Sequence, residues 1–220
     1  MTMMKTEDLF FLEYLRSLYP NPGCALVFSN PFQCLCAVML SAQTTDESVN
    51  KVTPLLFARY PTPFEMAKAD VDEVASIIHS LGLFKAKANH LIGISKALVG
   101  NYGGEVPSDK GQLRLLPGVG IKTSNVVGAI CFGIPAIAVD THVARVSKRL
   151  GYVKDSDEPE EIERKLERRF PKEEHIDLHY RIILFGRNVC HAKKPDCQNC
   201  ELGCWCRYFK KSSSIKGKKS

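Results

Sequence analysis

Apolar side chains recur every three or four positions along most of this chain, and this helical spacing constrains the fold more than any other feature of the sequence. In residues 8–18 they drift along one helix face, and residues 32–40 form a largely apolar stretch that suits a helix buried on most sides. No run alternates apolar and polar residues for long enough to indicate a strand. The sequence therefore predicts an all-α protein, with further helices after Asp46 and over residues 71–78, 86–99, 122–131, 142–150, 159–169 and 175–189.

The size and composition indicate a globular protein with one large domain or two small ones. The chain has 220 residues, of which 45% are hydrophobic and 25% are charged. Pro135 separates a long central helical block from the later helices, so we expect two lobes. The longest apolar run near the N-terminus, residues 34–40, is too short to span a bilayer, and no signal peptide is visible. We therefore expect a soluble cytoplasmic protein.

The charge is unevenly distributed. A formal net charge of +6 favours a polyanionic partner. Five lysines crowd a tail with Ser and Gly that we expect to be disordered from about residue 210: Lys210, Lys211, Lys216, Lys218 and Lys219. The tail has two interpretations, since such a segment either keeps a protein soluble or contacts DNA.

Nine cysteines are unusual in a chain with no secretion signal, where disulfides are not expected. Four of them lie in apolar surroundings that suit small core residues: Cys24, Cys34, Cys36 and Cys131. The other five cluster near the C-terminus, which predicts a metal or iron–sulfur site: Cys190, Cys197, Cys200, Cys204 and Cys206. Four thiolates hold either a zinc ion or an iron–sulfur cluster, although zinc sites more often show two Cys-x2-Cys pairs and only one occurs here.

The segment from Leu116 to Ser124, Leu-Pro-Gly-Val-Gly-Ile-Lys-Thr-Ser, predicts a glycine turn between two helices. Gly118 and Gly120 allow positive φ and leave backbone N–H groups accessible. The following helix begins near Lys122, so its free N–H groups and positive dipole end can hold a phosphate. This is the pattern of a helix-hairpin-helix, which grips the DNA backbone regardless of sequence.

Lys122 and Asp140 each have an ordinary interpretation and a catalytic one. Lys122 is a solvated or phosphate-binding lysine, or a nucleophile whose free amine is favoured by burial and by the helix end. Asp140 begins a later helix as an N-cap, a position from which a carboxylate can also face a cleft.

Three segments together resemble the helix-hairpin-helix DNA glycosylase superfamily: Leu40-Ser-Ala-Gln-Thr-Thr-Asp46, Leu116-Pro-Gly-Val-Gly-Ile-Lys-Thr123 and Val139-Asp-Thr-His142. The spacing Cys190-x6-Cys197-x2-Cys200-x5-Cys206 narrows the resemblance to the endonuclease III branch. The similarity runs from about Leu9 to Tyr208.

The resemblance implies a base-excision repair enzyme that is both a DNA glycosylase and an AP lyase. Lys122 would attack C1′ of a flipped, oxidised pyrimidine nucleotide and then cut the strand by β-elimination through a Schiff base. Asp140 would stabilise charge on the sugar and help to deprotonate Lys122. Gln43 and Leu83 would fill the gap left in the duplex; their ordinary interpretations are a loop glutamine and a buried leucine.

The resemblance also implies the remaining partners and cofactor. Hairpin residues Gly118, Val119, Gly120 and Thr123 would contact the DNA backbone. The selected cysteines, Cys190, Cys197, Cys200 and Cys206, would hold a 4Fe–4S cluster that makes the loop 191–196 rigid. Lys193 and Lys194 of that loop would then meet phosphates, unless the loop is simply solvated.

The implied architecture is two helical lobes with a DNA-binding cleft between them. Residues 24–134 would form a six-helix barrel lobe with the hairpin, and residues 1–23 with 135–220 would form the iron–sulfur lobe. We expect a monomer that acts on double-stranded DNA of the nucleoid and binds no membrane.

Four alternatives stay open at this point. A sister adenine-specific mismatch glycosylase typically lacks a lysine at the position of Lys122 and carries a further C-terminal domain. A mismatch-specific thymine glycosylase shares much of the framework. A non-catalytic DNA-binding module would explain the hairpin and the lysines but not Lys122 together with Asp140. A zinc-stabilised structural protein would explain only the cysteines.

Overall fold

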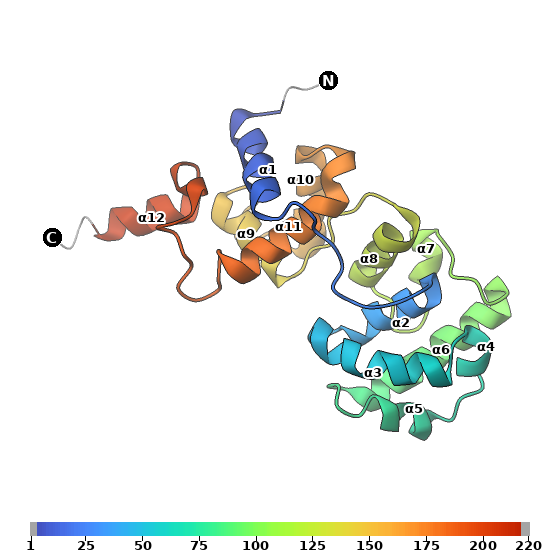
Figure 1. Ribbon diagram of the computed structural model, residues 1–220. Coiled ribbons are helices and arrows are strands. Elements are labelled where there is room, and N and C mark those ends of the chain that lie inside the picture. The colour runs from blue at the N-terminus through green and yellow to red at the C-terminus, as the bar shows by residue number, and fades with distance from the viewer. Residues whose placement is uncertain (1–3, 217–220) are drawn as a thin grey trace. The chain divides into compact units, whose positions relative to one another are not determined.

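The computed structural model describes residues 4–216 of the chain, with side chains as far as Lys211, and all regular structure in this part is helical (Figure 1). This confirms the predicted fold class. The helices are α1 (Thr6–Leu18), α2 (Pro31–Leu40), α3 (Asp46–Arg59), α4 (Pro63–Met66), α5 (Val71–Ile77), α6 (Phe84–Tyr102), α7 (Lys110–Leu113), α8 (Ile121–Phe132), α9 (Thr141–Leu150), α10 (Pro159–Arg169), α11 (His175–Asn188) and α12 (Arg207–Lys216), with short 3₁₀ helices η1 (Lys172–Glu174) and η2 (Glu201–Cys204).

The chain divides into two compact units. One is Cys24–Ile134, which we call the hairpin unit; the other combines Met1–Gly23 with Pro135–Ser220, and we call it the cysteine unit. Each unit has its own hydrophobic core. No helix in the described part of the chain is both long and apolar enough to cross a bilayer.

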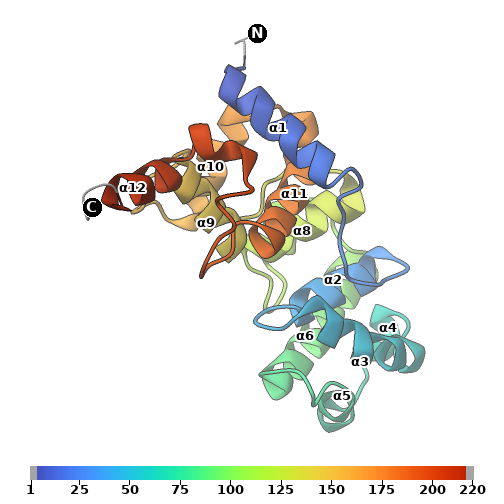
Figure 2. The ribbon, with the colours of Figure 1, turned by 60° about the vertical axis from the view of Figure 1, so that its left-hand side comes forward.

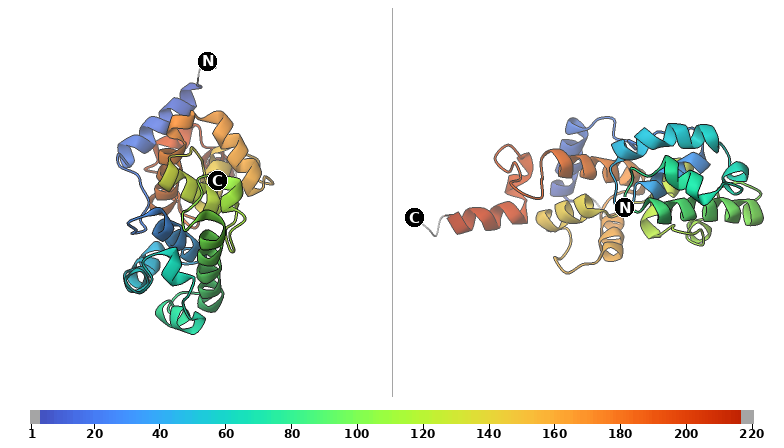
Figure 3. Two further views of the ribbon diagram at one scale, coloured as in Figure 1. Left: turned by 90° about the vertical axis from the view of Figure 1, so that its right-hand side faces the viewer. Right: turned by 90° about the horizontal axis from the view of Figure 1, so that it is seen from below.

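The hairpin unit is built around two buried helices. Nearly every side chain of α2 is buried, as its apolar sequence predicts, and α2 packs against α3, α6 and α8. The long helix α6 lies against α4 and α5 (Figure 3), and it buries Leu91, Ile94 and Leu98 completely. Since α6 begins directly after Leu83 and its residues His90 and Gly93 lie against the turn at residues 117–118, it connects these two segments of the unit.

The cysteine unit brings the two ends of the chain together. Helix α11 packs against both α1 and α9, which Figures 1 and 2 show. Phe11 and Leu15 of α1 are buried in the same core as Phe185 of α11. The buried Asp8 carboxylate accepts from the Arg169 guanidinium, at 2.6 Å, which ties α1 to the end of α10.

The ends of the helices show where local signals succeed and where they do not. Asp70 caps α5 as predicted, because its carboxylate accepts from the N–H groups of Asp72 and Glu73. Asp46 does not cap α3; it is the first helical residue, and the hydroxyl of Thr45 accepts from the N–H of Ser48 instead. The four-residue helices α4 and α7 were not predicted, since they are too short to show a period.

The expected disorder from about residue 210 is wrong as far as Lys216, because α12 continues to that residue. The start of this helix is held by packing: Tyr208 lies under the Arg149 guanidinium, 4.5 Å from ring centre to Cζ, and the Phe209 ring lies beside Gly203. The Lys216 side chain and residues 217–220, with Lys218 and Lys219, lie outside the described part.

Candidate functional site

The predicted hairpin is present in the hairpin unit, between α7 and α8. Leu116 and Val119 are buried and anchor the turn in the core, whereas Pro117, Gly118 and Gly120 are exposed. The turn closes through the Val119 N–H, which donates to the Leu116 carbonyl at 3.1 Å. Because the Val119 side chain is buried, only its backbone is available to a ligand.

Helix α8 begins without a side-chain cap, since its N-cap is Gly120. The first hydrogen bond of the helix comes from the Ser124 N–H to the Gly120 carbonyl, at 3.0 Å. The earlier N–H groups of Ile121, Lys122 and Thr123 therefore have no acceptor within the helix. Together with the positive dipole end, they form an arrangement that suits a phosphate oxygen.

Residues of α6 pack against the hairpin turn. Gly118 has a φ of +75°, and a Cβ placed there would lie 2.7 Å from Nδ1 of His90. One turn further along α6, a Cβ on Gly93 would lie 3.2 Å from Pro117. The turn thus packs directly on α6. Glycine suits position 118 because it adopts positive φ without strain and because it has no Cβ to overlap His90.

The Gly118→Ala variant should lower the free energy of unfolding by about 1–3 kcal/mol, because alanine is strained at positive φ and its Cβ overlaps His90. Gly120→Ala is the matched control, since a Cβ at Gly120 meets nothing within 4 Å. Urea unfolding of both variants measures the difference. Equal stability of the two would contradict the packing of the hairpin on His90.

Lys122 is the second residue of α8 and its side chain is exposed. The expectation that burial would favour its free amine is therefore wrong for the described chain. Its position on the first turn of α8 places the amine beside the free backbone N–H groups of the helix start.

Asp140 is the N-cap of α9 in the cysteine unit, and its Oδ1 accepts from the Val143 N–H at 2.8 Å. Its other carboxylate oxygen makes no hydrogen bond with the described residues, so the cap leaves one oxygen available. Nearby, burial lowers the pKa of His142, and the Asp140 charge opposes that shift only in part. His142 packs tightly against Gly186 of α11, where a Cβ would lie 2.9 Å from it.

Gln43, Leu83 and Lys194 are the non-glycine residues with positive φ in the described part of the chain, at +54°, +59° and +51°. Such a conformation costs roughly 1–2 kcal/mol for an L-residue. Leu83 is 64% exposed, so the interpretation of a buried leucine is wrong. An exposed leucine in a strained conformation is unexplained by packing, and strain of this kind concentrates at binding sites.

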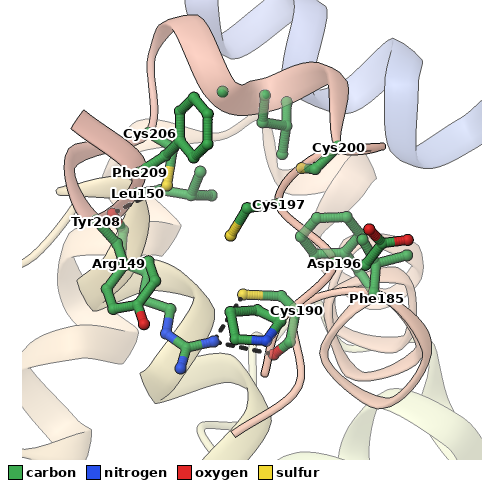
Figure 4. A pocket seen from close by; sticks show the side chains of 14 residues that line it. Arg149, Leu150, Phe185, Cys190, Asp196, Cys197, Cys200, Cys206, Tyr208 and Phe209 are labelled. Atoms are coloured by element: carbon green, nitrogen blue, oxygen red, sulfur yellow. Dashed lines mark hydrogen bonds between the residues drawn. The ribbon is translucent and has the colours of Figure 1, made fainter. Parts of the chain in front are cut away.

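In the cysteine unit, four cysteines line one pocket (Figure 4): Cys190, Cys197, Cys200 and Cys206. Cys204 is exposed and does not line it. The rest of the lining is mostly apolar and includes Leu150, Phe185 and Leu202. The pocket thus contains the same four cysteines that the family spacing implies, although residue spacing alone leaves Cys204 as a candidate.

The donor set of this pocket fits an iron–sulfur cluster. Burial raises the pKa of the Cys200 thiol to about 11 and also raises that of Cys197, so thiolates need a positive centre beside them. No three His, Cys, Asp or Glu side chains in the described residues are grouped as ligands of a single ion. A 4Fe–4S cluster binds four thiolates, one at each iron atom, and the four cysteines of this pocket can supply them.

Arg149 of α9 connects this pocket to the loop 191–196, and sequence reasoning missed it. Its guanidinium donates to Cys190 Sγ at 3.2 Å (Figure 4). It also donates to the carbonyls of His191 and Ala192, at 2.6 and 3.0 Å. Lys193 and Lys194 are exposed on the loop that Arg149 holds. No sequence signal identifies Arg149, because its partners, the Cys190 thiol and three backbone carbonyls, lie 41 to 43 residues away.

The structure therefore places the predicted residues in two groups. The hairpin unit carries Lys122 together with Gln43, Leu83, Gly118, Val119, Gly120 and Thr123. The cysteine unit carries Asp140, the four cysteines, Lys193 and Lys194.

Comparison with known proteins shows which family this chain resembles. Residues 36–172 match the HhH-GPD superfamily of base excision DNA repair proteins. The chain is 47% identical to endonuclease III of Bacillus subtilis (strain 168) over 198 residues, which are 90% of each chain. It also resembles a solved structure of a trapped covalent intermediate of endonuclease III with DNA, an estranged-adenine complex, with a TM-score of 0.90, 45% identity and coverage of 96% of this chain and 100% of that one.

A thermostable thymine-DNA glycosylase shares the fold, with a TM-score of 0.84 over 93% of this chain and 97% of that one. Its sequence identity is only 24%.

Proposed function

Because the chain belongs to the endonuclease III family within the HhH-GPD superfamily of base excision DNA repair proteins, we propose that it is both a DNA glycosylase and an AP lyase. Its substrates are oxidised pyrimidines and abasic sites in duplex DNA. One observation carries the proposal: an uncapped helix start, at a glycine turn, presents an exposed lysine amine beside free backbone N–H groups. The N–H groups suit a phosphate, and the amine suits attack on the sugar of that nucleotide.

Lys122 supplies the nucleophile. Its free amine forms a bond to C1′ as the glycosidic bond breaks, and the damaged base leaves with the bonding electrons. Loss of the amine proton and opening of the sugar ring then convert this adduct into a Schiff base. The Schiff base acidifies C2′, and removal of a C2′ proton expels the 3′ phosphate by β-elimination. An amine is the common side chain that forms an iminium at a sugar carbon.

Asp140 supplies a negative charge. Its Oδ1 caps α9 by accepting a hydrogen bond from the Val143 N–H, at 2.8 Å. The other oxygen is then available to stabilise positive charge on the sugar and to accept a proton from Lys122.

Gln43 and Leu83 fill the gap that the flipped nucleotide leaves. Gln43 presents hydrogen-bonding groups to the orphaned base, and the exposed Leu83 side chain enters the base stack. Extrusion of a base costs a few kcal/mol, less for a damaged base, and such insertions offset part of that cost. Their positive φ values are consistent with side chains held out from the core.

Cys190, Cys197, Cys200 and Cys206 would hold a 4Fe–4S cluster, which supplies a rigid cross-link and no part of the reaction. The link would join the loop 191–196 to the start of α12, so that Lys193 and Lys194 meet phosphates. We further propose that the protein acts as a monomer on DNA in the cytoplasm.

The test uses wild-type protein and duplexes that contain thymine glycol, an abasic site, a G·T mismatch or no lesion. We expect base release and strand cleavage with thymine glycol, cleavage at the abasic site, and neither with the undamaged duplex. Activity confined to the mismatch would favour a thymine glycosylase. Binding without release or cleavage on any duplex would favour a DNA-binding module.

A further inference from the structure

Lys87 is a buried lysine on the first turn of α6, and the proposed reaction does not use it. Its side chain is 4% exposed, and its Nζ donates to Oγ1 of Thr44 at 2.7 Å. Among the described residues, the Nζ group has no other hydrogen-bond partner, and no carboxylate pairs with it. A buried ammonium group near the positive end of a helix costs free energy, and a neutral hydroxyl offsets only a part of it.

The bond from Lys87 connects the two loops that carry Gln43 and Leu83. On one side, the Lys87 backbone N–H donates to the Leu83 carbonyl at 3.0 Å, so Lys87 lies one helical turn from Leu83. On the other side, Thr44 directly follows Gln43. The Thr44 hydroxyl accepts from Lys87 and donates to the Ala42 carbonyl at 3.3 Å. The chain of hydrogen bonds therefore spans Gln43 and ends on α6, whose N-cap residue is Leu83.

This bridge joins two strained residues in one compact unit. Gln43 and Leu83 both have positive φ, and strained backbone persists only where its surroundings over-determine it. Stability alone gives no reason for a lysine here, because an apolar side chain of similar volume is commonly as stable or more so in a buried position. Burial also lowers the pKa of Lys87, as expected for an ammonium group with no anionic partner.

We propose that Lys87 is a positioning residue that holds Gln43 and Leu83 in fixed relation, so that both enter the duplex when a nucleotide is flipped. This inference rests on the proposed function. It assigns Lys87 no contact with the reacting atoms, since its one polar partner is Thr44. Through the hydrogen bond from Lys87 to Thr44, insertion of Gln43 into the duplex favours insertion of Leu83, and the reverse.

The test compares Lys87→Met, which keeps the volume but removes the donors, with Thr44→Val, which removes the acceptor. Lys85→Met is the matched control, since Lys85 is exposed on the same helical turn. Borohydride trapping is followed on one abasic oligonucleotide, either single-stranded or in a duplex with 2-aminopurine opposite the site. Fluorescence of the 2-aminopurine reports how the orphaned base is stacked.

We expect both bridge variants to trap the duplex about tenfold more slowly, a loss typical of one hydrogen bond to a charged group. Both should lose most of the fluorescence change on binding, and both should trap the single strand at the wild-type rate, because it has no gap to fill. The double variant should be no slower than either single variant. The Tm of Lys87→Met should equal or exceed that of wild type.

Wild-type rates and fluorescence changes in both bridge variants would overturn the inference and leave the proposed function intact. Equal losses on single strand and duplex would also overturn it, because the defect would not concern the gap. If Lys87→Met does not fold, Thr44→Val carries the same comparison. Failure of wild type to trap either substrate would instead reject the proposed lyase reaction.

Discussion

Replacing Lys122 by glutamine is expected to abolish borohydride trapping of an abasic duplex while the protein still folds and binds DNA. The variant lacks the amine that we propose forms the Schiff base, and a glutamine amide cannot replace it as a nucleophile. Loss of a nucleophile lowers turnover by several orders of magnitude. The exposed position of Lys122 on α8 means that the substitution removes no core packing, so Tm should stay near the wild-type value.

Two further variants serve as comparisons for Lys122→Gln. Lys96→Gln changes another exposed lysine, on α6, and should trap as wild type does. Asp140→Asn keeps an N-cap for α9, because asparagine caps as well as aspartate, yet it removes the negative charge. We expect it to slow trapping about 10²–10⁴-fold without a change in Tm. Continued trapping by Lys122→Gln would show that another amine is the nucleophile and would reject the assignment.

Replacing Cys206 by alanine is expected to remove the proposed iron–sulfur cluster, whereas replacing Cys204 should leave it intact. The two residues are two positions apart, but only Cys206 lines the pocket with the other three cysteines. A structural metal site contributes much of the stability of the region around it. The Tm of Cys206→Ala should therefore fall by roughly 10 °C or more, with loss of visible absorbance and of bound iron and sulfide.

The wild-type protein should be brown and contain iron with sulfide. A colourless wild-type protein with stoichiometric zinc would reject the cluster and favour a zinc-stabilised structural site. Cluster loss in Cys204→Ala, with retention in Cys206→Ala, would show that the exposed cysteine is the ligand and that the pocket lining is misleading.

Short-range patterns in the sequence were sufficient for the fold class. Long amphipathic periods predict α6, α10 and α11 because each helix buries one face, and a face recurs every three or four residues. The hairpin is also local, since its glycines and helix start lie within one nonapeptide. Reliance on local patterns also explains which helices were missed. Helices α4 and α7 are too short to show a period, and the packing of Tyr208 and Phe209 that holds the start of α12 leaves no periodic signal.

Other features of the site were decided only by tertiary structure. Positive φ at Gln43 and Leu83 has no sequence signal, because neither residue prefers that conformation and the surrounding fold must impose it. The choice of Cys206 over Cys204 depends on which side chain faces the pocket, and the exposure of Lys122 depends on the packing around α8. The bridge from Lys87 to Thr44 joins residues 43 positions apart. The sequence by itself thus determined the long helices, the turn and the candidate reactive residue types, which follow from local backbone and side-chain preferences. Burial, strain and long-range hydrogen bonds depend on neighbours distant in the chain, so only the folded structure decided them.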